Sequence, residues 1–159
     1  MILYHGSSVK VLEPRLLEKQ RRLDFGSGFY TTSDLNQAAR WAQRTAKRLR
    51  QSDAFVTVYE MIDVALYELR VLRFEQPDSQ WLEFVVANRR GIFIPDNWDI
   101  ISGPAANDQT SSVIDLYEQG MYDEPEAIRR LLPQKLKDQY TFKTEAAVRL
   151  LRCKEAFQV

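Results

Sequence analysis

The sequence contains few of the residues on which disulfide-bonded and metal-binding proteins depend. Among 159 residues, Cys153 is the only cysteine and His5 the only histidine. One cysteine excludes a disulfide within the chain, and the two residues offer too few ligands for an ordinary structural zinc site. The start "MILYHGSS" lacks the basic and apolar regions of a signal peptide, and no apolar run is long enough to cross a bilayer. We therefore expect a cytoplasmic protein with no membrane partner and no metal.

Net charge is also absent. The 22 basic residues balance 22 acidic ones, so no overall field attracts the protein to nucleic acid or to anionic membranes, although a local patch can. Hydrophobic residues make up 45% of the chain, which is enough for a buried core in a protein of this length. No internal repeat, low-complexity tract or linker divides it. Residues 1–159 are thus predicted to form a single domain.

Strand-like and helix-like patterns are mixed along the chain. Short stretches rich in aromatic and β-branched residues predict strands at "ILYH", "GFYTT", "AFVTVYEMI", "LRVLRF", "WDIISG" and "DQYTFK". Apolar residues at helical spacing, together with capping and stop residues, predict helices near residues 35–49, 80–90, 111–119, 125–132 and 145–152. The order lacks the regular alternation of a doubly wound sheet, so the predicted class is α+β.

The helix expected at residues 35–49 has a basic outer face. Its members, with one residue just beyond the helix, are Arg40, Arg44, Lys47, Arg48 and Arg50. A row of cations on an exposed helix is usually a solvated face, and that interpretation has the larger weight. A contact surface for phosphates is the alternative.

The stretch "DFGSGFYTT", residues 24–32, places two glycines, an acid and adjacent aromatics at a corner that leads into a strand. Glycine allows a positive φ or a close approach of the backbone to a ligand. The letters "DFG" do not indicate a kinase here, because the glycine-rich loop, strand lysine and His-Arg-Asp loop of kinases are missing. "GSGFYT" precedes a strand and does not join a strand to a helix, which disfavours a dinucleotide-binding Rossmann motif.

Three separated pieces of the sequence together resemble ADP-ribosyltransferases, particularly the poly(ADP-ribose)-polymerase-like branch. The pieces are "YHG" near the start, "FGSGFY" followed by "DLNQAARWA", and "DQYTF" near the end. They match that branch's His-Gly strand, its Phe-Gly-x-Gly-x-Tyr stretch and its late Asn-Glu-Tyr-like strand. The chain also resembles a poorly characterised bacterial domain family with "LYHGS", "DFGxGFY" and "GPxAND" motifs. The resemblance implies a split antiparallel sheet flanked by helices, with NAD as the ADP-ribose donor.

The resemblance also assigns residues that contact NAD. His5 would hydrogen-bond a ribose hydroxyl, and the backbone of Gly6, next to Ser7, would pair with the nicotinamide carboxamide. Tyr30 would help to hold the nicotinamide-ribose in a bent conformation, and Ser7 and Gly28 are also expected among the residues that bind NAD. These roles suit the residue types, because imidazole donates to or accepts from a hydroxyl and glycine leaves its backbone open to a planar amide.

Trp41 follows Tyr30 by eleven positions, where the branch has an aromatic that stacks on nicotinamide. An indole suits that role because aromatic faces attract an electron-poor pyridinium ring. Trp41 also lies near the apolar stripe of its helix, so core packing is an equally good interpretation. Phe29 points to the other side of the strand from Tyr30 and is expected in the core. Ala38 stands where the branch often has a serine, so nicotinamide anchoring should depend more on Gly6.

Gln139 occupies the place of the family's glutamate, which stabilises the cation formed as nicotinamide leaves. Glutamine keeps a hydrogen-bond acceptor but has no negative charge, and such a loss raises a barrier by on the order of 3 kcal/mol, roughly a hundredfold in rate. Asp138 should face the other way on its strand and Glu145 lies at a helix start, so neither is a convincing substitute. The expected catalytic residues are His5, Tyr30 and Gln139.

Two further places are weaker candidates for contact with NAD or the acceptor. Asn107 and Asp108 lie in "GPAAND" after a predicted strand, although both are ordinary turn residues. Arg89 ends a predicted helix, where the helix dipole already favours a cation, so a pyrophosphate contact ranks low.

The leading hypothesis from the sequence is an NAD-dependent mono-ADP-ribosyltransferase that releases nicotinamide. Its acceptor, a macromolecule or a small molecule, is not identified by the sequence. A bacterial toxin or defence effector with an antitoxin-like partner would be a natural setting. The alternatives are a catalytically weak or inactive module that binds NAD or ADP-ribose, and a protein-interaction domain that retains only the fold. A related RNA phosphotransferase activity is disfavoured, because that branch relies on a second histidine.

Overall fold

A computed structural model describes the chain except residues 18–22, 63–67, 93, 96 and 107. Its strands are β1 (Ile2–Ser7), β2 (Phe29–Thr31), β3 (Phe55–Met61), β4 (Val71–Arg73), β5 (Ile100–Pro104), β6 (Asp138–Phe142) and β7 (Leu151–Gln158). Its helices are α1 (Leu35–Leu49), α2 (Ser79–Arg90), α3 (Asp108–Glu118), α4 (Glu124–Leu131) and α5 (Glu145–Val148). The predicted α+β class is confirmed.

The strands form two sheets. The first has the order β1-β3-β7 and the second the order β2-β6-β5-β4. All paired strands run antiparallel except β4 and β5, which run parallel, so the prediction of a wholly antiparallel sheet is wrong at that edge. The parallel pair follows from the chain path, because α2 and its flanking loops carry the chain from β4 to the start of β5.

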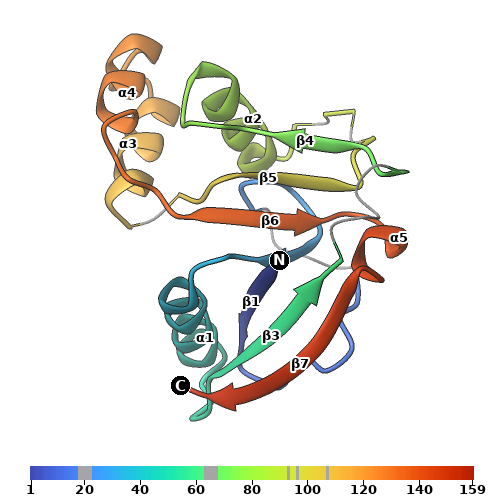
Figure 1. Ribbon diagram of the computed structural model, residues 1–159. Coiled ribbons are helices and arrows are strands. Elements are labelled where there is room, and N and C mark those ends of the chain that lie inside the picture. Colours follow the sequence, from blue (N-terminus) through green and yellow to red (C-terminus); the bar gives the residue numbers. More distant parts are fainter. Residues whose placement is uncertain (18–22, 63–67, 93, 96, 107) are drawn as a thin grey trace.

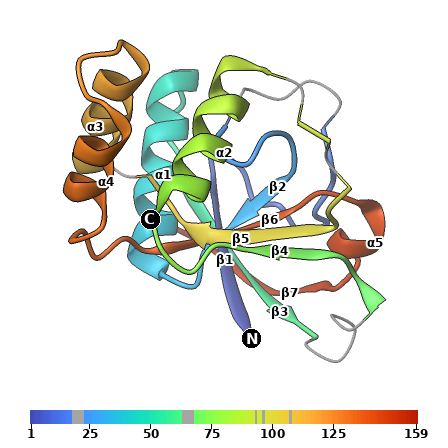
Figure 2. The same cartoon turned by 90° about the horizontal axis from the view of Figure 1, so that it is seen from above.

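The two sheets meet where β1 passes β2. Tyr4 and Thr32 form an antiparallel bridge there, exchanging N–H···O bonds of 2.8 and 3.0 Å. Helices α2, α3 and α4 cover one side of the second sheet, while α1 lies beside β1 of the first (Figure 1). Seen from above, the strands of the two sheets cross one another (Figure 2). The bridge therefore joins two layers that diverge on either side of it.

Two main clusters of buried side chains hold these layers together. One lies between the sheets and includes Leu3, Phe29, Tyr59 and Phe142. The other joins the second sheet to α2, α3 and α4, with the indole of Trp81 fully buried at its centre. Phe29 is 6% exposed, as expected for a core residue. Burial of this apolar area supplies most of the driving force for the fold.

Local signals in the sequence identify most helix ends correctly. Asp34 caps α1 by accepting a hydrogen bond from the N–H of Gln37, and Asp78 caps α2 in the same way. Gly91 ends α2 in the left-handed region, as expected for a stop residue. Among the described residues, no helix is long and apolar enough to span a membrane.

The helix predicted at residues 145–152 is largely wrong. It stops at Val148, and the chain continues as β7, which pairs with β3 along its whole length. Charged residues interrupt the alternation of β7, so its sequence gives a poor strand signal. Backbone hydrogen bonds to a strand about ninety residues earlier decide the outcome, which local propensity does not contain.

Candidate functional site

The imidazole of His5 is fixed between β1 and β2. Its Nδ1 lies 2.7 Å from the carbonyl oxygen of Tyr30, and its ring stacks on Phe29 with centroids 4.3 Å apart. A carbonyl only accepts hydrogen bonds, so Nδ1 carries the proton and donates. In the neutral ring, Nε2 is then an acceptor. Burial lowers the pKa of His5, and the bond to Tyr30 opposes this shift only in part, so the neutral form predominates at neutral pH.

We expect acid to destabilise the protein through His5. Its folded-state pKa is below the ordinary value of 6.5, so the unfolded chain takes up a proton first as the pH falls. The free energy of unfolding should therefore decrease below about pH 6.5, by up to about 1.4 kcal/mol per pH unit, until the folded ring protonates. Urea denaturation at several pH values measures this. His5→Asn, which keeps a donor near Tyr30, should show a smaller decrease; equal decreases would contradict the assignment.

The backbone of Gly6 is partly exposed at the point where the sheets part. Because hydrogen-bonding direction alternates along an antiparallel strand, the N–H and C=O of Gly6 point toward β2, as those of Tyr4 do. Continuing the Tyr4 to Thr32 register would place Gly6 opposite Tyr30. The Tyr30 carbonyl accepts from His5 instead. In the described part of the chain, neither backbone group of Gly6 has a hydrogen-bond partner on that side.

Gly6 also permits α1 to lie against β1. A Cβ at this position would be 2.0 Å from the carbonyl oxygen of Ala38 and 2.7 Å from the nitrogen of Ala42. Both are backbone atoms of α1, and both alanines are buried. Glycine on the strand and alanine on the helix together allow this close approach. Gly6 therefore has a packing role in addition to the open backbone edge.

Tyr30 holds the preceding loop. Its hydroxyl donates to the carbonyl of Gly26 at 2.7 Å and accepts from the N–H of Phe25 at 3.0 Å. Gly26 and Gly28 both have positive φ, 74° and 154°, which explains the two glycines of "DFGSGFYTT". Ser7, at the end of β1, is partly exposed and lies within the same segment as His5. The tyrosine thus has a structural task that the sequence did not reveal.

Asp24, the acid of the stretch "DFGSGFYTT", also has a structural role. Asp24 accepts from Arg89 Nε at 2.8 Å and from the N–H of Ala106 at 3.3 Å, and Lys143 Nζ donates to the carbonyl of Phe25 at 2.7 Å. Arg89 is thereby paired with a carboxylate, which leaves the suggested pyrophosphate contact without support. The loop is tied to α2, to the segment after β5 and to the end of β6. Asn107 and the side chain of Asp108 lie outside the described part of the chain.

Trp41 lies on α1, one turn beyond Ala38. It is partly exposed and belongs to none of the three clusters of buried residues in the described chain. Its indole N–H has no hydrogen-bond partner among the described residues. The core-packing interpretation of Trp41 therefore loses weight.

Gln139 lies on β6, on the same face of the second sheet as Tyr30. Tyr30 pairs with Thr141, and Gln139 is two residues away, so the three side chains share that face. Gln139 is 3% exposed, and its Nε2 lies 3.4 Å from the carbonyl of Pro104, which is a long hydrogen bond. Asp138 points the other way, toward Ser33 and Thr32, as the strand period predicts.

One polar residue of this face was not predicted from the sequence to belong to the site. Thr141 is the cross-strand partner of Tyr30 and lies two residues from Gln139. It is fully buried, and its Oγ1 has no hydrogen-bond partner among the described residues. A buried hydroxyl without a partner is unfavourable and therefore uncommon in native proteins. Threonine is an ordinary strand residue, so nothing in the sequence distinguishes it.

A second missed feature is the polar network that fixes the corner between β2 and α1. Gln37 Nε2 donates to Thr32 Oγ1 at 3.0 Å and to the carbonyl of Asp138 at 2.7 Å. Lys137 lies 3.0 Å from Asp34, and its hydrogen bond is the main cause that lowers the pKa of that carboxyl. The network connects the start of α1 to β6 and so sets the position of Trp41 relative to the strands.

Two hollows occur elsewhere on the described surface. One, of about 550 Å³, lies at the C-terminal end of α1, and the other, of about 260 Å³, lies near the ends of β4 and β5. Neither is lined by His5, Tyr30, Trp41 or Gln139. The structure thus brings His5, Gly6 and Tyr30 together, sets Trp41 on the adjoining helix, and buries Gln139 in the sheet.

Comparison with known proteins gives one match. The model of a family described as "Protein of unknown function (DUF3990)" matches residues 1–153. No curated protein and no solved structure matches the chain. The match covers every element that contributes to the site.

Proposed function

The chain belongs to the DUF3990 family, and from the geometry of its own residues we propose that it is an NAD-dependent mono-ADP-ribosyltransferase with an ADP-ribosyltransferase-like split sheet. The observation that carries the proposal is the parting of β1 and β2. There, Gly6 offers an adjacent N–H and C=O, and His5 directs Nδ1 inward and leaves Nε2 as an acceptor. A primary carboxamide next to a hydroxyl-bearing sugar has the complementary groups.

NAD presents those groups in that order. The nicotinamide carboxamide would accept from the N–H of Gly6 and donate to its carbonyl, and a ribose hydroxyl would donate to Nε2 of His5. Trp41 would supply an aromatic face for the positively charged pyridinium ring. Tyr30 would act by holding the loop that borders the sugar, since its hydroxyl is bonded to Gly26 and Phe25.

The reaction would proceed by departure of nicotinamide before the acceptor attacks. The bond between ribose C1′ and the nicotinamide nitrogen breaks, and its electron pair goes to nicotinamide. A lone pair of the acceptor then forms the new bond to C1′, and the acceptor loses its proton. Gln139 is 3% exposed, and in this proposal it would turn toward the cationic sugar and offer only a neutral oxygen, so we expect turnover roughly a hundredfold slower than with a carboxylate.

A second function, a module that binds NAD or ADP-ribose without turnover, is favoured by one observation. Gln139 is neutral and buried, and its amide donates to Pro104. The same Gly6 and His5 contacts would then serve binding alone. A domain that retains only the fold would bind no NAD.

The decisive experiment incubates the purified protein with NAD and follows free nicotinamide by chromatography, with and without cell extract. His5→Asn keeps a side-chain donor for the Tyr30 carbonyl and removes Nε2, so it tests the acceptor without opening the strands. Release that needs extract and is lost in the variant supports the transferase. Saturable NAD binding without release, lost in the variant, supports the binding module. If the folded wild type shows neither nicotinamide release nor NAD binding, both the transferase and the binding module are contradicted.

A further inference from the structure

The larger hollow is separate from the proposed NAD site. It holds about 550 Å³, within the range of ligand pockets, and opens at the C-terminal end of α1. Its lining residues come from the segment after β1 and from the turn between α1 and β3; they are Ser8, Val9, Lys10, Arg50, Gln51, Ser52, Asp53 and Phe55. We refer to it as the α1 hollow.

Arg50, on its rim, has a backbone conformation that arginine seldom adopts. It has φ 55° and ψ 39°, and it is the only non-glycine residue with positive φ among those described. The end of α2 has the same geometry and uses Gly91, with φ 66° and ψ 30°. Glycine is the favoured residue at this position because it has no Cβ. The chain thus tolerates backbone strain to keep a cation at the hollow, and such strain often marks a functional position.

A second cation lines the same hollow. Lys10, from a different segment, places its ammonium 5.6 Å from the centroid of the Phe55 ring. Lys47 and Arg48 are exposed in the last turn of α1. The acid on the rim, Asp53, accepts a hydrogen bond of 3.0 Å from Gln158. The cations therefore outnumber the acids at the hollow.

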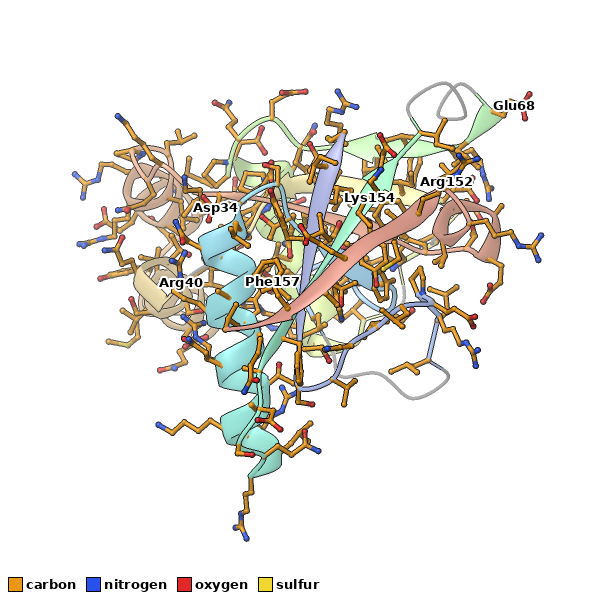
Figure 3. The ribbon with its side chains drawn as sticks, turned by 60° about the horizontal axis from the view of Figure 1, so that its bottom comes forward. Asp34, Arg40, Glu68, Arg152, Lys154 and Phe157 are labelled. Carbon is orange, nitrogen blue, oxygen red and sulfur yellow. The ribbon has the colours of Figure 1, made fainter. Side chains whose placement is uncertain are left out.

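This basic region continues along α1. Residues 35–52 contain Arg40, Arg44, Lys47, Arg48 and Arg50 and no aspartate or glutamate. The helix dipole accounts for cations in the last turn. It does not account for Arg40 about two turns earlier, for Lys10 on another segment or for the strain at Arg50. In Figure 3, nitrogen-tipped side chains project from the last turn of α1, and Arg40 lies on the same helix, far from Arg152.

We propose that the α1 hollow and the basic outer side of α1 bind single-stranded nucleic acid. Arginine and lysine bind phosphates, and about 15 Å of helix separates Arg40 from Arg50, long enough to follow several of them. Phe55 lines the hollow, and an unpaired base would stack on its ring in place of the Lys10 ammonium, which would then pair with a phosphate. In a duplex the bases are paired and stacked inside the helix and cannot enter such a recess, and an acidic peptide has no bases. The inference does not depend on NAD binding.

Fluorescence anisotropy with a labelled oligothymidine strand of about 12 nucleotides tests the proposal. We expect the logarithm of the association constant to fall linearly with the logarithm of the salt concentration. The slope should be about −3, as four phosphate contacts require. Arg50→Gly should weaken binding about fivefold and reduce the slope by about 0.7. The same variant should raise the midpoint of thermal unfolding by about 2 to 4 °C, because it relieves the strain.

Arg152→Gly is the matched control, since it removes one exposed arginine on β7, away from the hollow. It should leave oligonucleotide affinity within about twofold of the wild type and should not raise the unfolding midpoint. The proposal is overturned by absence of binding at about 50 mM salt, or by equal weakening in the two variants. It is also overturned if a duplex, a mononucleotide or polyglutamate binds more tightly than the strand.

Discussion

Gln139→Glu should accelerate release of nicotinamide from NAD by roughly a hundredfold, or about 3 kcal/mol in the barrier. The substitution changes one amide to a carboxylate on the face that Gln139 shares with Tyr30. Gln139 is 3% exposed, so burial favours the neutral carboxylic acid in the free protein. A cationic sugar beside it favours the ionised form. The gain should therefore grow as the pH rises, which stopped-time chromatography of nicotinamide at several pH values measures.

Gln139→Asp provides the control for geometry. It introduces the same charge on a side chain that is one methylene shorter, so the acceleration should be much smaller. Gln139→Ala, which removes both charge and hydrogen bonding, should give no acceleration. A folded Gln139→Glu protein that releases nicotinamide no faster than the wild type would show that this position does not face the reacting sugar.

Gly6→Ala should have the largest effect on stability. The added Cβ would lie 2.0 Å from the carbonyl oxygen of Ala38 and 2.7 Å from the nitrogen of Ala42, and neither backbone atom can rotate away. Helix α1 must retreat from β1, which we expect to lower the free energy of unfolding by about 3 kcal/mol. The midpoint of thermal unfolding should fall by about 6 to 12 °C. Calorimetry or circular dichroism at rising temperature measures this fall.

Gly120→Ala is the comparison for that experiment. Gly120 has φ 76° and nothing within 4 Å of an added Cβ, so its substitution tests backbone strain without collision. The expected loss is about 1 kcal/mol. If Gly6→Ala melts as high as Gly120→Ala, the close contact between α1 and β1 is not present in solution.

The helices were predictable where their signals are local. Alanines at helical spacing and the cap at Asp34 identify α1, and Gly91 identifies the end of α2. The strand β7 was not predictable, because its pairing with β3 joins distant segments and its own sequence is interrupted by charges. The parallel pairing of β4 with β5 is also a property of the chain path and not of either strand.

The residues of the candidate site also divide into those that the local sequence indicates and those that depend on long-range contacts. His5 and Gly6 were proposed from two adjacent letters, and the structure adds how each is oriented. The structural roles of Asp24 and Arg89 were not predicted, since their ion pair joins residues 65 positions apart. Thr141 was not identified because its distinguishing property, a buried hydroxyl without a partner, exists only after β2 and β6 pair. Long-range contacts thus decide which polar residues remain available to a ligand.

The most direct test of the account is nitrogen NMR of the His5 ring in tag-free protein, where the single histidine gives one pair of ring signals. The account predicts a neutral ring at about pH 7.5 with the proton on Nδ1. Addition of NAD to about 1 mM should then shift the Nε2 signal saturably and leave Nδ1 protonated, because Nε2 accepts the ribose hydroxyl. A free protein with the proton on Nε2, or an Nε2 signal that NAD does not move, would contradict the proposed site.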